Sequence, residues 1–276
     1  MKTQCKTAGA AVIGSSHTKN HKPCQDKVYS LFENNVTVCS LSDGAGSCSK
    51  SEIGADVCTK FVASFLCEHF DETYKQNEDA ISKLLVYRIN EKLTQIAAEL
   101  EISLIDLSST LLFVAVKKDK FIAGHIGDGL IGIFDESGSK MLSPPENGEY
   151  ENQTYFVTSG NALEHFRIYK DNLESITGFI LMSDGPYKSL FDRKTEQLTD
   201  ANLSFFSWLA DEKNSQEKVE EALKKALSNI IEAKRTSDDC SINLLSTKHI
   251  DGYFDKVIKI ITHQKWWTSL MKNITL

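Results

Sequence analysis

The sequence predicts an α+β fold in which helices and mainly antiparallel strands pack in layers within one large domain. Strand-like and long amphipathic segments are grouped along the chain, so the strand–helix alternation of a doubly wound parallel fold is missing. The central strand-like segments are joined by short turns, whereas parallel strands would need connections of a dozen residues or more. With 276 residues, 41% of them hydrophobic, the chain can bury a full core.

The first predicted elements are two strands joined by a long polar loop. We expect strands at residues 8–14 and 28–32 and a loop at 15–26. This loop is longer than a tight hairpin needs, and long loops on compact domains are often functional. A third strand begins at Val36 and ends at Asp43, because the two glycines that follow would interrupt it.

Two amphipathic helices follow these strands. In residues 49–70, apolar side chains recur at every fourth position from Ile53 to Phe65, which is typical of a helix with one buried face. Residues 78–100 carry a similar apolar stripe. Both helices therefore require a sheet against which to pack.

The remaining core is predicted to consist of strands and two further helices. Strands are expected at 109–117, 121–126, 130–134, 167–170, 179–183 and 240–245, and helices at 203–209 and 216–233. The first three of these strands are separated by short turns, so we expect an antiparallel meander. Residues 1–249 would form the domain. Residues 250–276 are expected to be a helical tail that packs on the domain or binds a partner.

Composition excludes several classes of function. The formal net charge is -7 and the isoelectric point is about 5.6, which argues against nucleic-acid binding because phosphate backbones require clustered Lys and Arg. Seven cysteines occur without a Cys-x-x-Cys pair, so reduced thiols in the cytoplasm are the simplest interpretation. No apolar segment approaches the ~20 residues of a membrane span, and we expect neither a signal peptide nor membrane association.

Acidic residues stand at the ends of several predicted strands. Asp43 and Asp184 each follow a serine and precede a glycine, and Asp128 lies between two glycines. A single strand that ends in Asp-Gly usually marks only a turn. Three such endings suggest instead that several carboxylates converge at one edge of a sheet, where they could hold a hard divalent cation.

These motifs form an ordered set that resembles a known family. Residues 20–26 (Asn-His-Lys-Pro-Cys-Gln-Asp), Ser-Asp43-Gly-Ala-Gly, Gly-Asp128-Gly, Ser-Asp184-Gly and Ser-Asp238-Asp-Cys-Ser resemble, in order and spacing, the signature segments of the metal-dependent protein phosphatases, the PPM or type 2C family. The resemblance covers about residues 8–247. Each motif is short, and their order along the chain carries the argument.

The resemblance implies a four-layer αββα sandwich with two mainly antiparallel sheets and a binuclear Mg or Mn centre. It implies hydrolysis of phosphoserine and phosphothreonine monoesters by a metal-bound hydroxide. Asp43 would bridge both ions, the Gly44 carbonyl would bind one, and Asp184 and Asp238 would hold the other. Asp26 would act mainly through coordinated water. The implied metal set is Asp43, Gly44, Asp184, Asp238 and Asp26, with Asp128 for a third, weaker ion.

The chain departs from the family pattern at the phosphate-binding position. His21 stands where many members carry an arginine, and Lys22 follows it. Neither side chain reproduces the bidentate guanidinium fork, so phosphate would be bound more weakly, or by protonated His21, Lys22 or Lys19. The predicted catalytic residues are Asp26, Asp43, His21 and Lys22. At the last motif we choose Asp238 over Asp239 as the ligand, because Asp239 falls on the asparagine of the family pattern.

Partner predictions follow from the same resemblance. Phosphorylated proteins would be the substrates, a cognate Ser/Thr kinase is a candidate partner, and we expect a monomer. General-acid roles for His17 and His125 stay open. The alternatives are a catalytically weak or inactive module that binds phosphoproteins and a P-loop nucleotidase built on residues 44–51.

Overall fold

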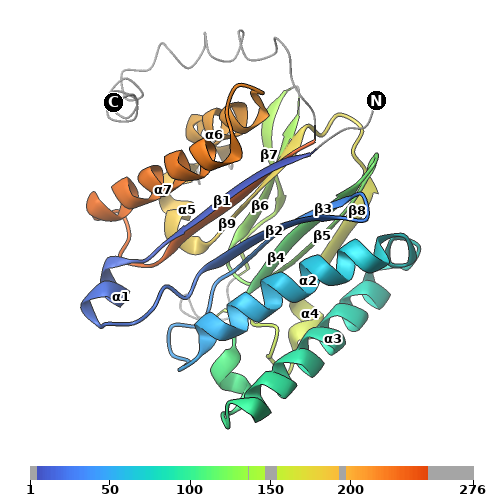
Figure 1. The fold of residues 1–276 in the computed structure, drawn as a ribbon, viewed down its shortest axis with the longest axis vertical. Coiled ribbons are helices and arrows are strands. Elements are labelled where there is room, and N and C mark those ends of the chain that lie inside the picture. Colours follow the sequence, from blue (N-terminus) through green and yellow to red (C-terminus); the bar gives the residue numbers. More distant parts are fainter. Residues whose placement is uncertain (1–4, 136, 147–153, 193–196, 248–276) are drawn as a thin grey trace.

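The computed structural model describes residues 5–135, 137–146, 154–192 and 197–247, and they form four layers. Two five-stranded sheets face each other, and helices cover the outer face of each sheet (Figure 1). The predicted α+β sandwich with an αββα arrangement is confirmed. The proposed tail, residues 250–276, lies outside the described residues.

The first sheet has the strand order β2-β3-β4-β5-β8, and every neighbouring pair is antiparallel. Its strands are β2 (Lys27–Glu33), β3 (Val36–Ser42), β4 (Leu111–Lys117), β5 (Lys120–Ile126) and β8 (Arg167–Asn172). The two long helices α2 (Ser51–Tyr74) and α3 (Glu78–Glu99) cover its outer face (Figure 1). The short elements η1 (Leu104–Leu107) and α4 (Ala162–His165) complete this half.

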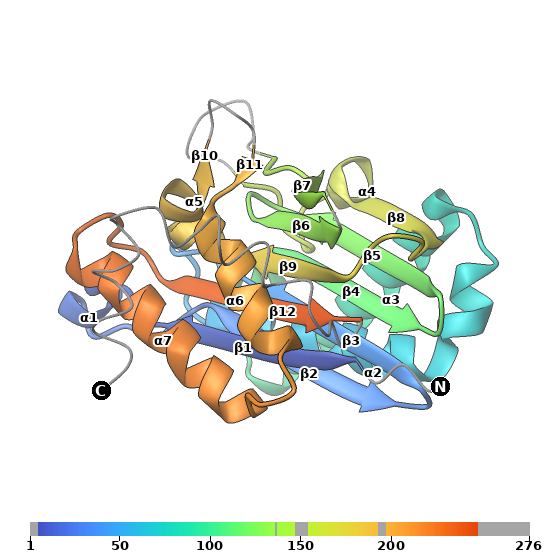
Figure 2. The same cartoon turned by 90° about the horizontal axis from the view of Figure 1, so that it is seen from above.

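The second sheet has the order β1-β12-β9-β6-β7 and is also antiparallel. Its strands are β1 (Lys6–Val12), β12 (Cys240–Ser246), β9 (Gly178–Met182), β6 (Leu130–Asp135) and β7 (Gly138–Ser143). Its helices are α5 (Asp184–Leu190), α6 (Asp200–Ala210) and α7 (Gln216–Glu232). A small hairpin of β10 (Phe191–Asp192) and β11 (Gln197–Leu198) projects beside α5, as Figure 2 shows.

Because side chains alternate between the two faces of a strand, each sheet contributes apolar residues to two layers. In β9, Phe179 and Leu181 face the other sheet, where they meet Cys39 and Leu112. Ile180 on the opposite face packs among α6 and α7. The result is one core between the sheets and one beneath each helical layer.

A buried asparagine joins the two sheets. Asn243 on β12 is fully buried, and its amide nitrogen donates to the carbonyl oxygens of Tyr29 (3.1 Å) and Ser40 (3.0 Å) on the other sheet. Its Oδ1 accepts a hydrogen bond from Ser30 Oγ at 3.2 Å. A buried amide is stable only when it is satisfied in this way, so these bonds fix one relative position of the sheets.

One topological prediction is wrong. The expected meander ends after β5, because β6 pairs with β9 and β7 in the opposite sheet. The chain crosses at residues 127–129, where Gly127 has φ of 121°, in the region that favours glycine. A Cβ on Gly127 would lie 2.5 Å from the Thr110 side chain. The expected loop 15–26 also contains a short helix, α1 (Ser15–Lys19).

No helix among the described residues is long and apolar enough to cross a membrane.

We expect Asn243→Ala to lower the free energy of unfolding by about 2–4 kcal/mol, because it removes three hydrogen bonds between the sheets and leaves a cavity at a fully buried position. Urea denaturation would measure this loss. Ser30→Ala, which removes one hydrogen bond to Asn243 and a weak contact with Cys39 Sγ, is the matched control and should cost about 1 kcal/mol. An equally small loss in Asn243→Ala would contradict the role of this side chain as a link between the sheets.

Candidate active site

The strand register brings distant acidic residues to one edge of the paired sheets. In the first sheet Lys27 lies opposite Ser42, so Asp26 and Asp43 are neighbours at the end of that pair. In the second sheet Met182 lies between Leu130 and Ile242, which places Asp184 at the same end. Asp128 in the crossing segment and Asp238 before β12 reach this edge as well. Folding thus gathers five acids from separate parts of the sequence.

Asp43 lies at the centre of this group. The carboxyl groups of Asp26 and Asp184 are close enough to that of Asp43 for their charges to raise its pKa. The charges of Asp128 and Asp238 also act on it. The five acids differ in their exposure to solvent. Asp26 is only 1% exposed, whereas Asp238 is exposed. The other three, Asp43, Asp128 and Asp184, are half-buried. The open side of the site is therefore at Asp238.

Burial and neighbouring charges raise the pKa of Asp26, Asp43 and Asp184. Burial raises the pKa of Asp26 to about 6, with a further contribution from the charge of Asp239. Burial followed by the charges of Asp128, Asp238 and Asp26 raises the pKa of Asp184 to about 8. Burial and the surrounding carboxylates raise the pKa of Asp43 well above its ordinary value. The fully ionised cluster therefore needs compensating positive charge.

The donor set fits divalent metal ions. Mg and Mn prefer oxygen ligands, and carboxylates with backbone carbonyls supply them here. Among the described residues, Oδ1 of Asp26 and Oδ1 of Asp184 are buried without a hydrogen-bond partner, which leaves ligand atoms free. As they stand, no three His, Cys, Asp or Glu side chains in the described part form a group that could hold a metal ion. The fit therefore rests on the kind of donor atoms that meet at this edge.

The side chain of Asp26 is held in place by Ser183, which follows β9, and through it by β12. Ser183 Oγ donates to Asp26 Oδ2 at 2.8 Å, and the Ser241 backbone N–H donates to Ser183 Oγ at 3.0 Å. This chain of hydrogen bonds connects an acid of the first sheet to the backbone of the second. It fixes one oxygen of Asp26 and leaves the other for a ligand or a proton.

Two glycines allow the segments of the site to approach closely. A Cβ on Gly185 would lie 1.9 Å from the Asp239 carbonyl oxygen, and one on Gly14 would lie 2.3 Å from the Asp238 carbonyl carbon. No side chain fits at either position. The glycine after Asp184 thus serves packing against β12, which the sequence pattern alone does not reveal.

Asp239 has a role that the sequence did not predict. It is 2% exposed, and its Oδ1 accepts the Gly14 N–H at 2.6 Å while its Oδ2 accepts the Gln25 N–H at 2.6 Å. His17 Nδ1 also lies 2.9 Å from Oδ2. We call Asp239, His17, Gly14 and Gln25 the clasp. The clasp joins both ends of the segment before Asp26 to the start of β12. The sequence signals for it were the acid Asp239 where the family pattern has asparagine, and the histidine His17 in the loop 15–26.

The predicted phosphate-binding residues are dispersed. His21 is exposed with φ of 54°, and Lys22 Nζ donates to the Gly46 carbonyl at 2.8 Å. Lys19 instead lines a groove that also contains Asp184 and Asp238. Of the three cationic candidates, Lys19 is therefore the one that shares a surface with these acids.

The two histidines considered as general acids are both enclosed. His125 is fully buried, with Nδ1 2.8 Å from Ser143 Oγ and 3.0 Å from an Arg167 nitrogen. Burial, aided by the charge of Arg167, lowers its pKa well below the ordinary value. His17 is 8% exposed and engaged with Asp239. These positions favour structural roles for both histidines.

The geometry also rejects a P-loop at residues 44–51. A P-loop binds phosphate through free backbone N–H groups. Here Gly44 N–H donates to the Gln25 carbonyl at 3.3 Å, and Ala45 N–H donates to the Ser108 carbonyl at 2.9 Å. The parallel βαβ unit that such a loop requires is absent from the described sheets, in which every strand pair is antiparallel.

The structure so far defines a class of αββα sandwich proteins with carboxylates gathered at one sheet edge. Comparisons with known proteins identify the family. Residues 13–231 match the family model described as Protein phosphatase 2C. The chain is 23% identical over 252 residues to serine/threonine-protein phosphatase 3 of Escherichia coli (strain K12), covering 85% of this chain and 95% of that protein.

Solved structures agree in fold. A bacterial serine phosphatase crystal structure has a TM-score of 0.62 at 13% identity, covering 90% of this chain and 100% of that chain. The serine/threonine phosphatase Stp1 from Staphylococcus aureus has a TM-score of 0.60 at 14% identity, covering 91% and 96%. Because the family model matches more than half of the sequence, the chain belongs to the protein phosphatase 2C family, and the resemblance drawn from its motifs is confirmed.

We expect the metal-free protein to lose thermal stability as the pH rises from 6 to 9. The raised pKa of Asp184, about 8 against an ordinary 3.8, means that folding favours the neutral carboxyl, so its stabilising effect is lost as pH rises through 8. Melting temperatures in chelator would measure this. Asp184→Asn should flatten the decline, whereas Asp79→Asn, at an exposed position on α3, should not. Equal slopes in all three proteins would contradict the prediction.

We expect the clasp to act as one unit. His17→Ala should lower the free energy of unfolding by about 1–3 kcal/mol, and Asp239→Ala should lower it more, because two backbone N–H groups also lose their acceptor. In a double-mutant cycle from urea denaturation, the two losses should be non-additive by about 1 kcal/mol or more. Strict additivity would mean that the two side chains do not support each other.

Proposed function

We propose that this protein is a metal-dependent serine/threonine protein phosphatase that hydrolyses phosphoserine and phosphothreonine monoesters with two Mg or Mn ions. The observation that carries the proposal is the set of acids around Asp43. Burial and neighbouring carboxylates raise the pKa of Asp43 and Asp184, and buried oxygens of Asp26 and Asp184 have no hydrogen-bond partner among the described residues. Membership of the protein phosphatase 2C family supports it. Phosphoproteins would be the substrates, supplied by a Ser/Thr kinase.

We propose that the residues indicated by the motifs would hold the ions. Asp43 would contact both ions, the Gly44 carbonyl one of them, and Asp184 and Asp238 the other. Asp26 would act through water, and Asp128 would serve a third, weaker ion. Such ions, when bound, lower the pKa of water and neutralise phosphoryl oxygens, which is the chemistry that a phosphomonoester dianion requires.

The protein's own groups orient the reaction. Ser183 fixes one oxygen of Asp26, so the free Oδ1 of this buried acid can hold or accept a proton at a defined place. The pKa of Asp26 near 6 suits exchange of a proton close to neutral pH. The exposed position of Asp238 leaves one open side through which a phosphorylated side chain can enter.

A measurement of turnover distinguishes the proposed enzyme from an inactive module that only binds phosphoproteins. We expect the parent protein to hydrolyse p-nitrophenyl phosphate and a phosphothreonine peptide when Mn²⁺ or Mg²⁺ is added, and Asp43→Asn to lower kcat/KM by about a hundredfold or more. The matched control Asp79→Asn should keep the parental rate. Absence of metal stimulation in the parent would refute the enzyme, and full activity in Asp43→Asn would refute the role of Asp43.

A further inference from the structure

A groove opens directly beside the exposed side of the acidic site. It has a volume of about 900 Å³ and lies among α1, α5 and the turn that follows α7, three segments that meet on one side of the second sheet (Figure 1). Asp184 and Asp238 form part of its lining. A group bound at these acids would therefore have the groove as its surroundings.

The rest of the groove is cationic, in contrast to the chain as a whole. Besides the two aspartates, its charged side chains are Lys19, Lys188, Lys234, Arg235 and Glu232. The protein carries a net charge of -7, yet here four positive groups face one negative group. Once cations neutralise Asp184 and Asp238, the groove becomes a positive surface beside the reacting phosphate.

The positive groups come from separate elements and form no salt bridge within the described part of the chain. Lys19 lies on α1, Lys188 on α5, and Lys234 and Arg235 follow α7, and all four are exposed. The salt bridges within the described residues join other side chains. Lys19 and Lys188 lie in the last turns of α1 and α5, so a favourable helix dipole is compatible with each cation taken singly. It does not by itself bring the ends of three helices to one groove.

The backbone around the groove is well defined. Arg235 N–H donates to the Ile230 carbonyl at 3.1 Å and Lys234 N–H donates to the Ile231 carbonyl at 2.9 Å, the pattern of a Schellman motif that ends a helix. Lys234 occupies its left-handed position with φ of 56°, where glycine is usual. Ser16 N–H donates to the Ser237 carbonyl at 2.9 Å, which joins α1 to the same turn.

We propose that this groove binds acidic residues next to the phosphorylated serine or threonine of a protein substrate. The proposal rests on the proposed phosphatase function, because it places the phosphoryl group at the acidic site. Exposed ion pairs at such a rim each contribute a factor of about two to four in affinity. Lys19, Lys188 and Arg235 together would thus give about a tenfold preference for acidic over basic flanks. Rim charges would also make this preference sensitive to salt.

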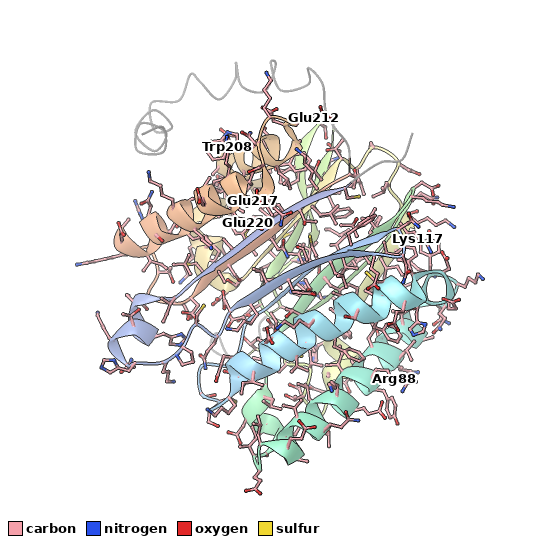
Figure 3. All side chains as sticks on the ribbon, in the orientation of Figure 1. Arg88, Lys117, Trp208, Glu212, Glu217 and Glu220 are labelled. Carbon is pink, nitrogen blue, oxygen red and sulfur yellow. The ribbon has the colours of Figure 1, made fainter. Side chains whose placement is uncertain are left out.

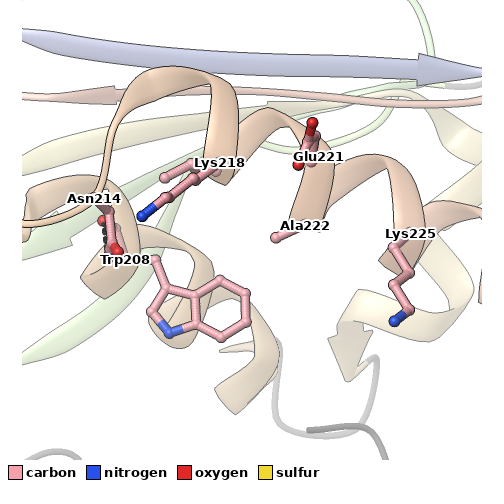
Figure 4. A pocket seen from close by; sticks show the side chains of 7 residues that line it. Trp208, Asn214, Lys218, Glu221, Ala222 and Lys225 are labelled. Carbon is pink, nitrogen blue, oxygen red and sulfur yellow. Dashed lines mark hydrogen bonds between the residues drawn. The ribbon is translucent and has the colours of Figure 1, made fainter. Parts of the chain in front are cut away.

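A second groove on α7 supplies matched control residues. It has a volume of about 440 Å³ and is lined by Trp208 and Asn214 with Lys218, Glu221 and Lys225 of α7 (Figure 4). Acidic side chains are frequent at the beginning of α7, where Figure 3 shows Glu217 and Glu220. Lys218 and Lys225 are exposed on the same helix, but they do not line the groove that contains Asp184.

The experiment compares two phosphothreonine peptides of equal length, one with acidic and one with basic flanks, together with p-nitrophenyl phosphate. With Mn²⁺, the full chain should show about tenfold higher kcat/KM for the acidic peptide, mainly through KM, and the ratio should shrink at high salt. The double variant Lys188→Glu and Arg235→Glu should lower that ratio about tenfold or more. The double variant Lys218→Glu and Lys225→Glu should leave it unchanged. The ratio of kcat/KM for the two peptides is compared because a general loss of activity lowers both values equally and cancels in the ratio.

The outcomes separate the two proposals. If p-nitrophenyl phosphate is hydrolysed with metal but the parent has no acidic preference, or the groove variant keeps the preference, this inference is overturned and the phosphatase stands. If nothing is hydrolysed, the proposed function fails, and fluorescence anisotropy of the labelled peptides on the same proteins decides the groove. Equal binding of both peptides by the parent would then overturn the inference, and an acidic preference that is lost only in the groove variant would support it.

Discussion

The main constraint on this structure is the mutual repulsion of carboxylates that folding brings together at one edge of the two sheets. Asp43 lies next to Asp26 and Asp184, and the charges of Asp128 and Asp238 also raise its pKa. In water these groups would separate, and burial adds a desolvation penalty to the repulsion. The rest of the fold must therefore supply enough stability to hold the site in the absence of bound cations.

That stability comes from the elements that carry the acids. Each acid lies within two residues of the beginning or the end of a strand. The strands are fixed in register by antiparallel pairing and by apolar contacts on both faces. Where no strand pairing is available, polar contacts replace it. The clasp at Asp239 holds the segment before Asp26, and Asn243 fixes the sheets relative to each other.

The sequence predicts the parts of this arrangement that depend on local patterns. Asp43 and Asp184 could be placed at strand ends because an apolar run and a following glycine are adjacent in the chain. The sheet that β6 joins could not be predicted, since a turn at 127–129 is equally compatible with a hairpin and with a crossing. The role of Asp239 was also hidden, because its partners Gly14, His17 and Gln25 are more than two hundred residues away.

The position of positive charge around the site follows from the same tertiary constraints. The loop before Asp26 places His21 in an exposed left-handed conformation, and Lys22 Nζ donates a hydrogen bond to the Gly46 carbonyl. The clasp meanwhile docks α1 against the turn after α7. That docking is what brings Lys19 to the groove that Lys188 and Arg235 also line. The positive charge beside Asp184 and Asp238 therefore comes from side chains of three separate elements that line one groove, and not from His21 and Lys22.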